Sequence, residues 1–175
     1  MSKIPISGIE LIKNNSKKDE RGYLAHLFDT TQDHFFASNS NFNSIAVLNK
    51  DMFTLRGMHY QVNESAETKV VFCLTGRIFD VVLDLRVTSE TYLQSYHGYF
   101  GPEEEFMGLT IPAGCAHGYL TLADETLMIY LIDKVHSPEN ERGISWNDPK
   151  FKIPWPETPI IISKRDKSHP SFEQE

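Results

Sequence analysis

Short runs of alternating hydrophobic and polar residues dominate the chain, and almost no stretch repeats its apolar positions with the 3.6-residue period of a helix. The clearest alternation is at 77–86, and the tight turn Thr75-Gly76 separates it from a second apolar run at 68–74. This pattern predicts that the two runs form an antiparallel hairpin. Further strands are predicted at 6–12, 19–28, 44–49, 55–61, 92–99, 106–111 and 126–132.

Glycine and proline interrupt this pattern about every ten residues, which is typical of an antiparallel sandwich or barrel. Residues 13–19 are polar and predict a loop, 29–43 predict a loop with a short helix, and 167–175 predict a solvated tail. The turn at 112–114 leads into His117-Gly118-Tyr119-Leu120. Since no linker, repeat or low-complexity tract separates these runs, we expect one domain over 1–175.

The net charge of −7 and the sequence pI near 5.5 argue against a nucleic-acid partner, because phosphate backbones are bound by clustered Lys and Arg. Cys73 and Cys115 both lie in apolar surroundings, which predicts buried thiols and no disulfide framework. No stretch approaches the roughly 18 apolar residues of a membrane span. These features lead us to expect a cytoplasmic protein without a membrane partner.

The segment 55–61, Leu-Arg-Gly-Met-His-Tyr-Gln, places a cation, a glycine and a histidine within four positions. An imidazole that its surroundings hold in a fixed position can take a proton from carbon and return it near neutral pH. On a regular strand Arg56 and His59 would face opposite sides, so a shared pocket requires Gly57 to twist or bulge the backbone. The alternative is a half-exposed strand with a surface arginine and a hydrogen-bonded histidine.

Other polar residues interrupt the predicted sheet and are candidates for the mouth of a barrel. Several cations around one pocket would suit a ligand with several negative charges, such as a diphosphate. Singly, each has a structural alternative, such as an edge charge for Lys69 or a place in a free tail for Asp166. The candidates are Arg21, Arg56, His59, Lys69, Asp84, His117, Tyr130, His136 and Asp166.

A metal site is not expected from this pattern. Barrels of this size often bind a metal through two histidines one residue apart on a strand, but the position after His59 and Tyr60 is Gln61. His59 and His117 alone do not complete a three-ligand site.

The separated motifs resemble, in order, those of nucleotide-diphosphate 4-keto-6-deoxysugar 3,5-epimerases, the family typified by dTDP-4-dehydrorhamnose 3,5-epimerase. The motifs are Asp-Glu-Arg-Gly at 19–22, the segment 55–61, Val-Leu-Asp-Leu-Arg at 82–86, Ile-Pro-Ala-Gly-Cys-Ala-His-Gly-Tyr at 111–119, Glu-Arg-Gly-Ile-Ser-Trp-Asn-Asp-Pro at 141–149 and Ser-Lys-Arg-Asp at 163–166. The resemblance implies an all-β, double-stranded β-helix (a cupin-like jelly-roll barrel), a homodimer with a swapped N-terminal strand, and epimerisation without cofactor or metal.

Position by position, the resemblance implies that His59 is the base and that Asp166 orients it. Lys69 would stabilise the enolate oxygen beside C4, because a C4 ketone acidifies the hydrogens on C3 and C5. His136 stands where the family has its second catalytic group, a tyrosine, and could serve as that acid; Tyr130 is the second choice. The expected substrate-binding residues are Arg21, His26, Arg56, Gln61, His117, Tyr130 and Arg165.

Two further departures concern the nucleobase. His26 replaces the glutamate that reads thymine in the dTDP-sugar enzymes, and Ser44-Ile45-Ala46 replaces their Gln-x-Asn pair. A site that reads a base by hydrogen bonds fails when its partners are exchanged. We therefore expect a CDP- or GDP-linked sugar in preference to a dTDP-linked one.

The sequence thus predicts an isomerase that inverts C3, C5 or both in a nucleotide-activated 4-keto sugar for surface polysaccharide synthesis. Two alternatives remain. A sugar 3,4-ketoisomerase would move the ketone, and a binding module that lost its second acid would hold the nucleotide sugar without turnover.

Overall fold

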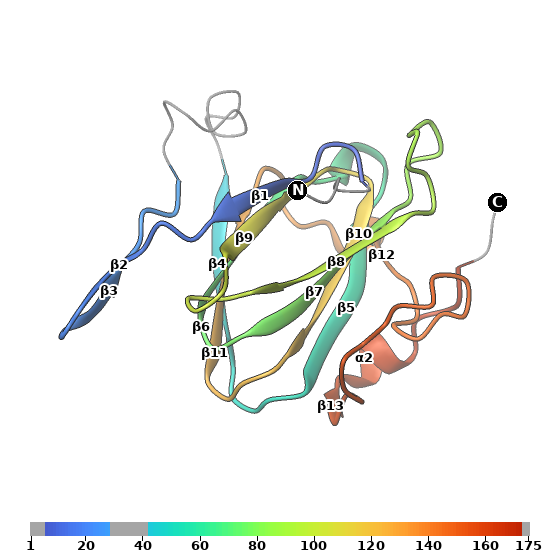
Figure 1. Ribbon diagram of the computed structural model, residues 1–175. Coiled ribbons are helices and arrows are strands. Elements are labelled where there is room, and N and C mark those ends of the chain that lie inside the picture. The colour runs from blue at the N-terminus through green and yellow to red at the C-terminus, as the bar shows by residue number, and fades with distance from the viewer. Residues whose placement is uncertain (1–5, 29–41, 173–175) are drawn as a thin grey trace.

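The computed structural model describes residues 6–28 and 42–172, and nearly all of its regular structure is β (Figure 1). The strands are β1 (Glu10–Lys13), β2 (Lys17–Asp19), β3 (Gly22–Leu24), β4 (Asn43–Asn49), β5 (Thr54–Gln61), β6 (Lys69–Thr75), β7 (Ile78–Asp84), β8 (Ser95–Phe100), β9 (Phe106–Ile111), β10 (Cys115–Thr121), β11 (Thr126–Ile132), β12 (Glu141–Gly143) and β13 (Ile161–Ile162). Two 3-10 turns, Asn63–Ser65 and Pro138–Asn140, and one short helix, α2 (Lys164–Lys167), complete the set. The helix predicted within 29–43 falls on residues outside those described.

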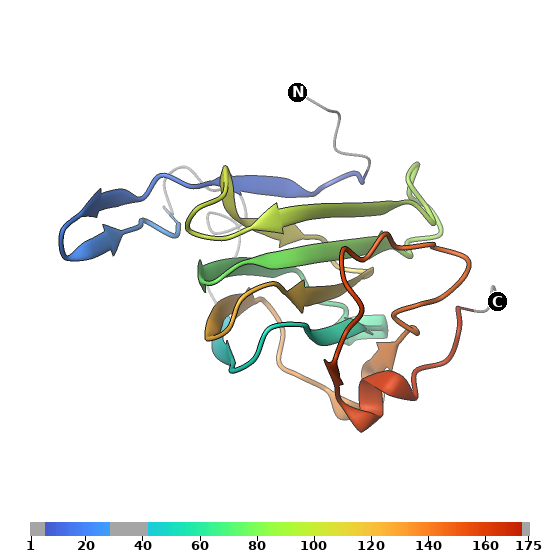
Figure 2. The ribbon, with the colours of Figure 1, turned by 60° about the horizontal axis from the view of Figure 1, so that its bottom comes forward.

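Two antiparallel sheets face each other, one in the order β1-β9-β6-β11-β4 and the other in the order β12-β5-β10-β7-β8 (Figures 1 and 2). Between them lies a core to which Val71, Leu109 and Met128 contribute from the first sheet and Val82 and Tyr119 from the second. Burying such side chains supplies most of the driving force for folding. This arrangement confirms the predicted cupin-like jelly roll.

The outer face of the second sheet is also covered. Leu55 and Leu83 on this face pack in one cluster with Ile144, Phe151 and Trp155 from the C-terminal segment (Figure 2). Both faces of β7 and β10 are therefore buried, which explains why these two strands are apolar along most of their length.

The hairpin predicted between 68–74 and 77–86 is wrong in its pairing, although both strands exist. β6 pairs with β11 and β9, whereas β7 pairs with β10 and β8. The turn at Gly76, whose φ is 76°, carries the chain from one sheet to the other. Since both strands are buried on their two faces, alternation could not identify their partners.

The solvated tail predicted at 167–175 is only partly right as far as the structure describes it, since Lys167, Ser168, Pro170 and Ser171 are exposed but the segment is held to the rest of the chain. The Phe172 N–H donates to Asp148 Oδ2 at 2.6 Å, and the Pro170 carbonyl accepts from the Ser145 N–H at 2.8 Å. The chain up to 172 is therefore docked on the second sheet. The prediction failed because the few apolar residues there, such as Phe172, are too sparse to show a period.

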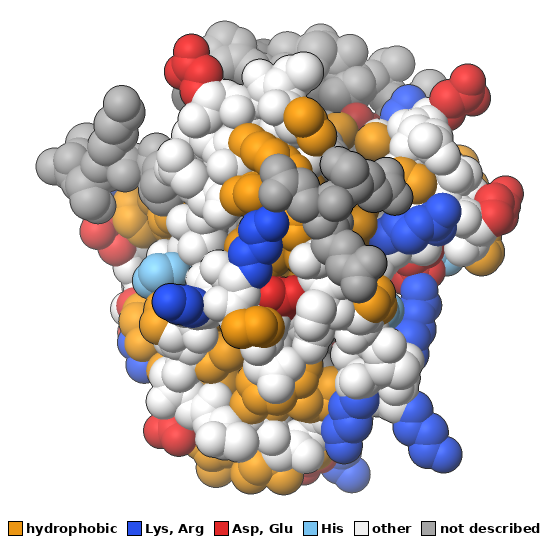
Figure 3. Space-filling view, turned by 90° about the vertical axis from the view of Figure 1, so that its right-hand side faces the viewer, with side chains coloured by type: hydrophobic (Ala, Val, Ile, Leu, Met, Phe, Trp, Pro, Cys, Tyr) orange, Lys and Arg blue, Asp and Glu red, His pale blue; other side chains and the backbone are white. Residues whose placement is uncertain are grey.

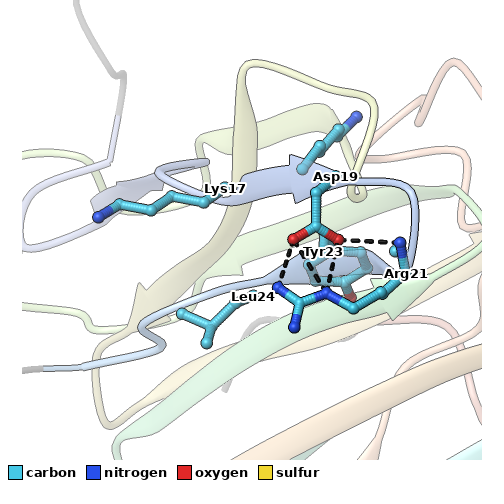
Figure 4. Close-up of a pocket in the computed structure, with 7 residues that line it drawn as sticks. Lys17, Asp19, Arg21, Tyr23 and Leu24 are labelled. Carbon is cyan, nitrogen blue, oxygen red and sulfur yellow. Dashed lines mark hydrogen bonds and ion pairs between the residues drawn. The ribbon is translucent and has the colours of Figure 1, made fainter.

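An arm formed by β2 and β3 extends away from the two sheets (Figures 1 and 2). At its tip the Arg21 guanidinium donates to the Asp19 carboxylate, with Nη2 2.5 Å from Oδ2, and the Asp19 carboxylate also caps the Arg21 N–H (Figure 4). Tyr23 and Leu24 are exposed large hydrophobic residues on this arm.

On the side of the molecule that carries the C-terminal segment, Lys and Arg side chains stand in separate groups among apolar and uncharged ones (Figure 3).

The bulge predicted at Gly57 is present. His117 on β10 faces His59, but Tyr119 faces Arg56, so β5 has one extra residue between the paired positions. Gly57 has a φ of 131°, and a Cβ there would lie 2.5 Å from Gly118 Cα. Only glycine tolerates both conditions, and the bulge lets Arg56 and His59 share one cavity.

Replacing Gly57 by alanine is expected to lower the free energy of unfolding by about 2 kcal/mol or more, because left-handed backbone strain and a backbone clash add. Urea unfolding measures this loss. Gly22→Ala is the matched control: its φ is also positive, at 123°, but no atom lies within 4 Å of the added Cβ. Equal losses for the two variants would show that the contact with Gly118 contributes nothing.

Candidate active site

A cavity of about 210 Å³ opens between the two sheets. Strands β4, β6 and β11 of one sheet and β5 and β10 of the other provide its walls. It is lined by Ile45, Val47, Arg56, His59, Lys69, His117, Tyr119, Tyr130 and Ile132. Apolar walls with a few convergent polar groups are typical of small-molecule sites.

His59 is backed by a buried carboxylate. His59 Nε2 lies 3.0 Å from Asp166 Oδ1, and the Asp166 side chain is 6% exposed while that of His59 is 31% exposed. A carboxylate accepts hydrogen bonds, so Nε2 carries the proton and Nδ1 keeps the lone pair that can take another. This is the orientation that a general base requires.

The bulge and α2 together place Asp166. β13 runs parallel to β5 and brings α2 behind it, where the Gly57 N–H donates to Asp166 Oδ2 at 3.3 Å and the Asp166 N–H donates to Ser163 Oγ at 3.0 Å. Burial alone would raise the pKa of Asp166, but the hydrogen bonds and charge of His59, with the bonds from Ser163 and Gly57, outweigh it and lower that pKa. Asp166 therefore stays ionised behind the imidazole.

Lys69 brings a nearly buried ammonium to the same cavity. Its Nζ lies 2.9 Å from Glu67 Oε1, and the two side chains are 10% and 9% exposed. Gln61 holds Glu67 from behind, since its Nε2 donates to Glu67 Oε2 at 2.5 Å and its Oε1 accepts from the Ser137 N–H at 2.8 Å. Gln61 thus reaches Lys69 through Glu67 and does not line the cavity.

His117 is held by a second buried carboxylate. Its Nε2 lies 2.8 Å from Asp80 Oδ2, both side chains are almost fully buried, and Asp80 Oδ1 has no partner among the described residues. The His117 ring packs against Tyr130 with the centroids 6.0 Å apart. Burial raises the pKa of Tyr130 well above its usual value, with further contributions from Tyr119 and Asp80, so its phenol stays protonated.

Arg56 is the exposed cation at the cavity. Its Nε donates to Asn49 Oδ1 at 2.8 Å, and the Tyr119 hydroxyl donates to the same oxygen at 3.2 Å. Asn49 is 2% exposed and is fixed by its own bond to the Thr126 carbonyl. The guanidinium is therefore oriented with Nη1 and Nη2 left for an anion.

Several residues predicted for the site lie elsewhere in the described chain. Arg21 and the exposed His26 belong to the arm and its continuation. His136 is 59% exposed and lies 3.5 Å from Glu141 Oε2, and Arg165 Nη2 pairs with Glu141 Oε1 at 2.5 Å. Asp84 is fully buried among Arg86, Ser89 and Thr91 at the end of β7, away from the lining of the cavity.

Sequence reasoning missed the groups that support these side chains: Asn49, Glu67, Asp80 and His169. Asp80 gave a signal, since it is a charged residue in the middle of an otherwise apolar strand. Glu67 precedes Lys69 by two residues and could have been paired with it. Nothing in the sequence indicated Asn49, or that His169 would fold back against His59.

Comparisons with known proteins identify related sequences and structures. The sequence model of the dTDP-4-dehydrorhamnose 3,5-epimerase family matches residues 3–174. A dTDP-4-dehydrorhamnose 3,5-epimerase of Sinorhizobium fredii is 34% identical over 174 residues, which cover 97% of this chain and 87% of that protein.

Crystal structures of two further proteins of that name share the fold. The enzyme of Elizabethkingia anophelis has a TM-score of 0.84 and 30% identity, with 97% of this chain and 94% of that one covered. The enzyme of Bacillus anthracis, with TDP and PPi bound, has a TM-score of 0.81 and 28% identity, with 94% and 100% covered. Among the described residues, none of the helices has the length and apolar character to cross a bilayer.

The family model and the relatives show that the chain belongs to the dTDP-4-dehydrorhamnose 3,5-epimerase family. The sequence prediction of an epimerase, an isomerase by reaction class, is confirmed.

Proposed function

We propose that the protein inverts C3, C5 or both in a nucleotide-diphosphate 4-keto sugar, with residues 1–175 acting as one domain and without cofactor or metal in the reaction. The observation that carries this proposal is one cavity that holds an imidazole backed by a buried carboxylate and a nearly buried ammonium. A carbon acid next to a ketone needs both a base and a positive charge for the enolate oxygen.

In this reaction His59 Nδ1 takes the proton from the carbon beside the ketone, and Asp166 stabilises the resulting imidazolium. The electron pair of the C–H bond moves to the C4 oxygen, where the Lys69 ammonium stabilises the enolate charge. An acid on the opposite face then returns a proton to the carbon and inverts it. His117, whose Nε2 donates to Asp80, can accept at Nδ1 a hydrogen bond from a sugar hydroxyl, and Arg56 binds the diphosphate.

Within one chain, Tyr130 fits the role of the second acid better than His136, because Tyr130 lines the cavity and His136 does not. We expect Tyr130→Phe to lower inversion by about 100-fold, the usual contribution of a positioned acid, and His136→Gln to leave it near the parent rate. Product NMR measures inversion, and deuterium wash-in from solvent measures the first step separately. The opposite ranking of the two variants would restore His136 as the acid.

We propose a homodimer in which the arm of each chain reaches the cavity of its partner and contributes Arg21 and His26. The arm projects from its own sheets, where the Leu74 carbonyl accepts a hydrogen bond from the Tyr23 hydroxyl, and it leaves the Tyr23 and Leu24 side chains partly exposed, which such a contact would bury. Sedimentation should give a dimer, and Tyr23→Ser with Leu24→Ser should weaken it and raise KM for the nucleotide sugar. A parent protein that sediments as a monomer at assay concentration would refute this arrangement.

The proposed nucleotide is CDP or GDP. A wall of Ile45, Val47 and Ile132 offers no hydrogen bond from its side chains where the cavity meets β4, and His26 replaces a base-reading glutamate. The Bacillus anthracis relative was crystallised with TDP, so dTDP is the reference ligand. We further propose that the reaction takes place in the cytoplasm and serves surface polysaccharide synthesis.

The test is a panel of CDP-, GDP-, UDP- and dTDP-4-keto-6-deoxy sugars incubated with the full chain, with products identified by NMR. Inversion at C3 or C5 supports the proposal, and comparison of kcat/KM between the four sugars shows which nucleobase the enzyme prefers. A ketone moved to C3 would identify a 3,4-ketoisomerase. Tight binding without any product would identify a binding module. Preference for the dTDP-linked sugar would refute only the proposed nucleotide, CDP or GDP, and not the reaction.

A further inference from the structure

A second imidazole packs against the His59–Asp166 pair. His169 Nε2 lies 3.7 Å from Asp166 Oδ1, and the rings of His59 and His169 meet edge to face with centroids 5.3 Å apart. The His169 side chain is 10% exposed, and its Nε2 is enclosed without a hydrogen-bond partner among the described residues. Buried polar nitrogens nearly always have a partner, so this nitrogen is a candidate ligand atom.

The fold holds the His169 ring in this place. β12 pairs with β5 so that Gly143 stands opposite His59. The His169 ring fills the space over Gly143, where an added Cβ would lie 2.3 Å from the ring. The Ser145 N–H to Pro170 carbonyl bond fixes the next residue of the segment. The position of His169 is therefore built by two strands and the docked C-terminal segment.

One ligand atom from each of His59, Asp166 and His169 can be chosen so that all three lie within 4.8 Å of one another. Two imidazole nitrogens and one carboxylate oxygen are a usual zinc ligand set, with a fourth position open to water. Arg165, the cation next to Asp166, is paired with Glu141. We propose that His59, Asp166 and His169 bind a divalent transition metal such as Zn²⁺, and that the ion inhibits the enzyme.

Inhibition follows from the atoms involved. Metal binding displaces the proton on His59 Nε2, which passes to solvent, and separates the imidazole from the Asp166 carboxylate. A dipositive ion bound to the His59 ring then opposes protonation at Nδ1, so His59 can no longer act as the base. Binding depends on the three side chains alone, whereas inhibition rests on the proposed function, in which His59 is the base.

The binding test adds Co²⁺ to chelator-treated full-length protein and follows the visible absorption of the bound ion, then displaces it with Zn²⁺. We expect one ion per chain. His169→Gln should weaken affinity by roughly 100-fold, since even removal of a supporting residue costs 10- to 100-fold. His97→Gln, which changes an exposed histidine on β8, should bind like the parent. Equal affinity of parent and His169→Gln, or no binding by the parent, would overturn the site.

Histidine NMR of the parent protein makes the test independent of variant folding. Zn²⁺ should shift the ring signals of His59 and His169 and leave those of His97 unchanged; the reverse pattern would overturn the proposal. In the epimerase assay, each variant is compared with its own metal-free rate, and only the parent and His97→Gln should lose turnover as Zn²⁺ binds. Metal bound at these residues without loss of turnover would overturn inhibition.

Discussion

Replacing His59 by glutamine is expected to lower the rate of deuterium wash-in at the reacting carbon by about 1,000-fold, within the range that a positioned general base contributes. Glutamine keeps a donor toward Asp166 but has no basic nitrogen. Because His59 Nε2 is hydrogen-bonded to the Asp166 carboxylate at 3.0 Å, only Nδ1 is left to take the proton from carbon. Wash-in measured by NMR reports this step without requiring net inversion.

His97→Gln is the matched control, since it removes an exposed histidine from β8, outside the cavity. Both variants should bind the nucleotide sugar and melt near the parent temperature. If His59→Gln exchanged at the parent rate, His59 would be excluded as the base. If His97→Gln lost exchange as severely, loss of a histidine in general would explain the effect.

Replacing Lys69 by methionine is expected to lower kcat by about 100- to 1,000-fold, the usual cost of removing a group that stabilises a developing oxyanion. The substitution also leaves the nearly buried Glu67 carboxylate without a countercharge, bonded only to the Gln61 amide, which destabilises the fold. Stability and catalysis must therefore be separated before the loss of rate is assigned to the enolate.

The double variant Lys69→Met with Glu67→Gln makes this separation, because it removes the stranded charge and keeps an amide beside Gln61. We expect it to regain most of the melting temperature that Lys69→Met loses, without regaining kcat. Recovery of kcat in the double variant would show that Lys69 acts only by neutralising Glu67.

The class of fold was predictable from residue periodicity, whereas strand partners were not. The sequence predicts strands at 106–111 and 126–132 with the bounds of β9 and β11, because each is a largely apolar run between polar or turn residues. The pairing of β6 with β7 failed because both strands are buried on two faces, so each offers equivalent edges to several partners.

The site was predictable where a residue carries the chemistry and not where it only supports it. An irregularity at Gly57 is predictable from strand geometry, since a regular strand would turn Arg56 and His59 to opposite sides, and the structure shows that it is a bulge. The proximity of Asp166 to His59 came from the family resemblance. Asp80 on β7 acts on His117 of the neighbouring strand β10, and that contact depends on a register which the sequence does not specify. Glu67 acts on Lys69 from two residues away in the chain, so that pair needs no strand register.

The C-terminal segment shows the same limit. Residues 167–172 are mostly polar, and two hydrogen bonds hold them to the chain. The Phe172 N–H bonds to Asp148, 24 residues earlier in the sequence, and the Pro170 carbonyl bonds to the Ser145 N–H. His169 is consequently absent from the residues that the sequence predicts for the site, and the expectation of no metal site rests on His59 and His117 alone.

The most direct test of the central claim uses the parent protein with a 4-keto-6-deoxy nucleotide sugar in deuterated water, followed by NMR from the first turnover. The mechanism predicts that solvent deuterium appears at C3, at C5 or at both, on each carbon that inverts, because the proton leaves carbon for His59 and a different group returns one. Inversion that retains the original hydrogen, with no solvent label at either carbon, would contradict it.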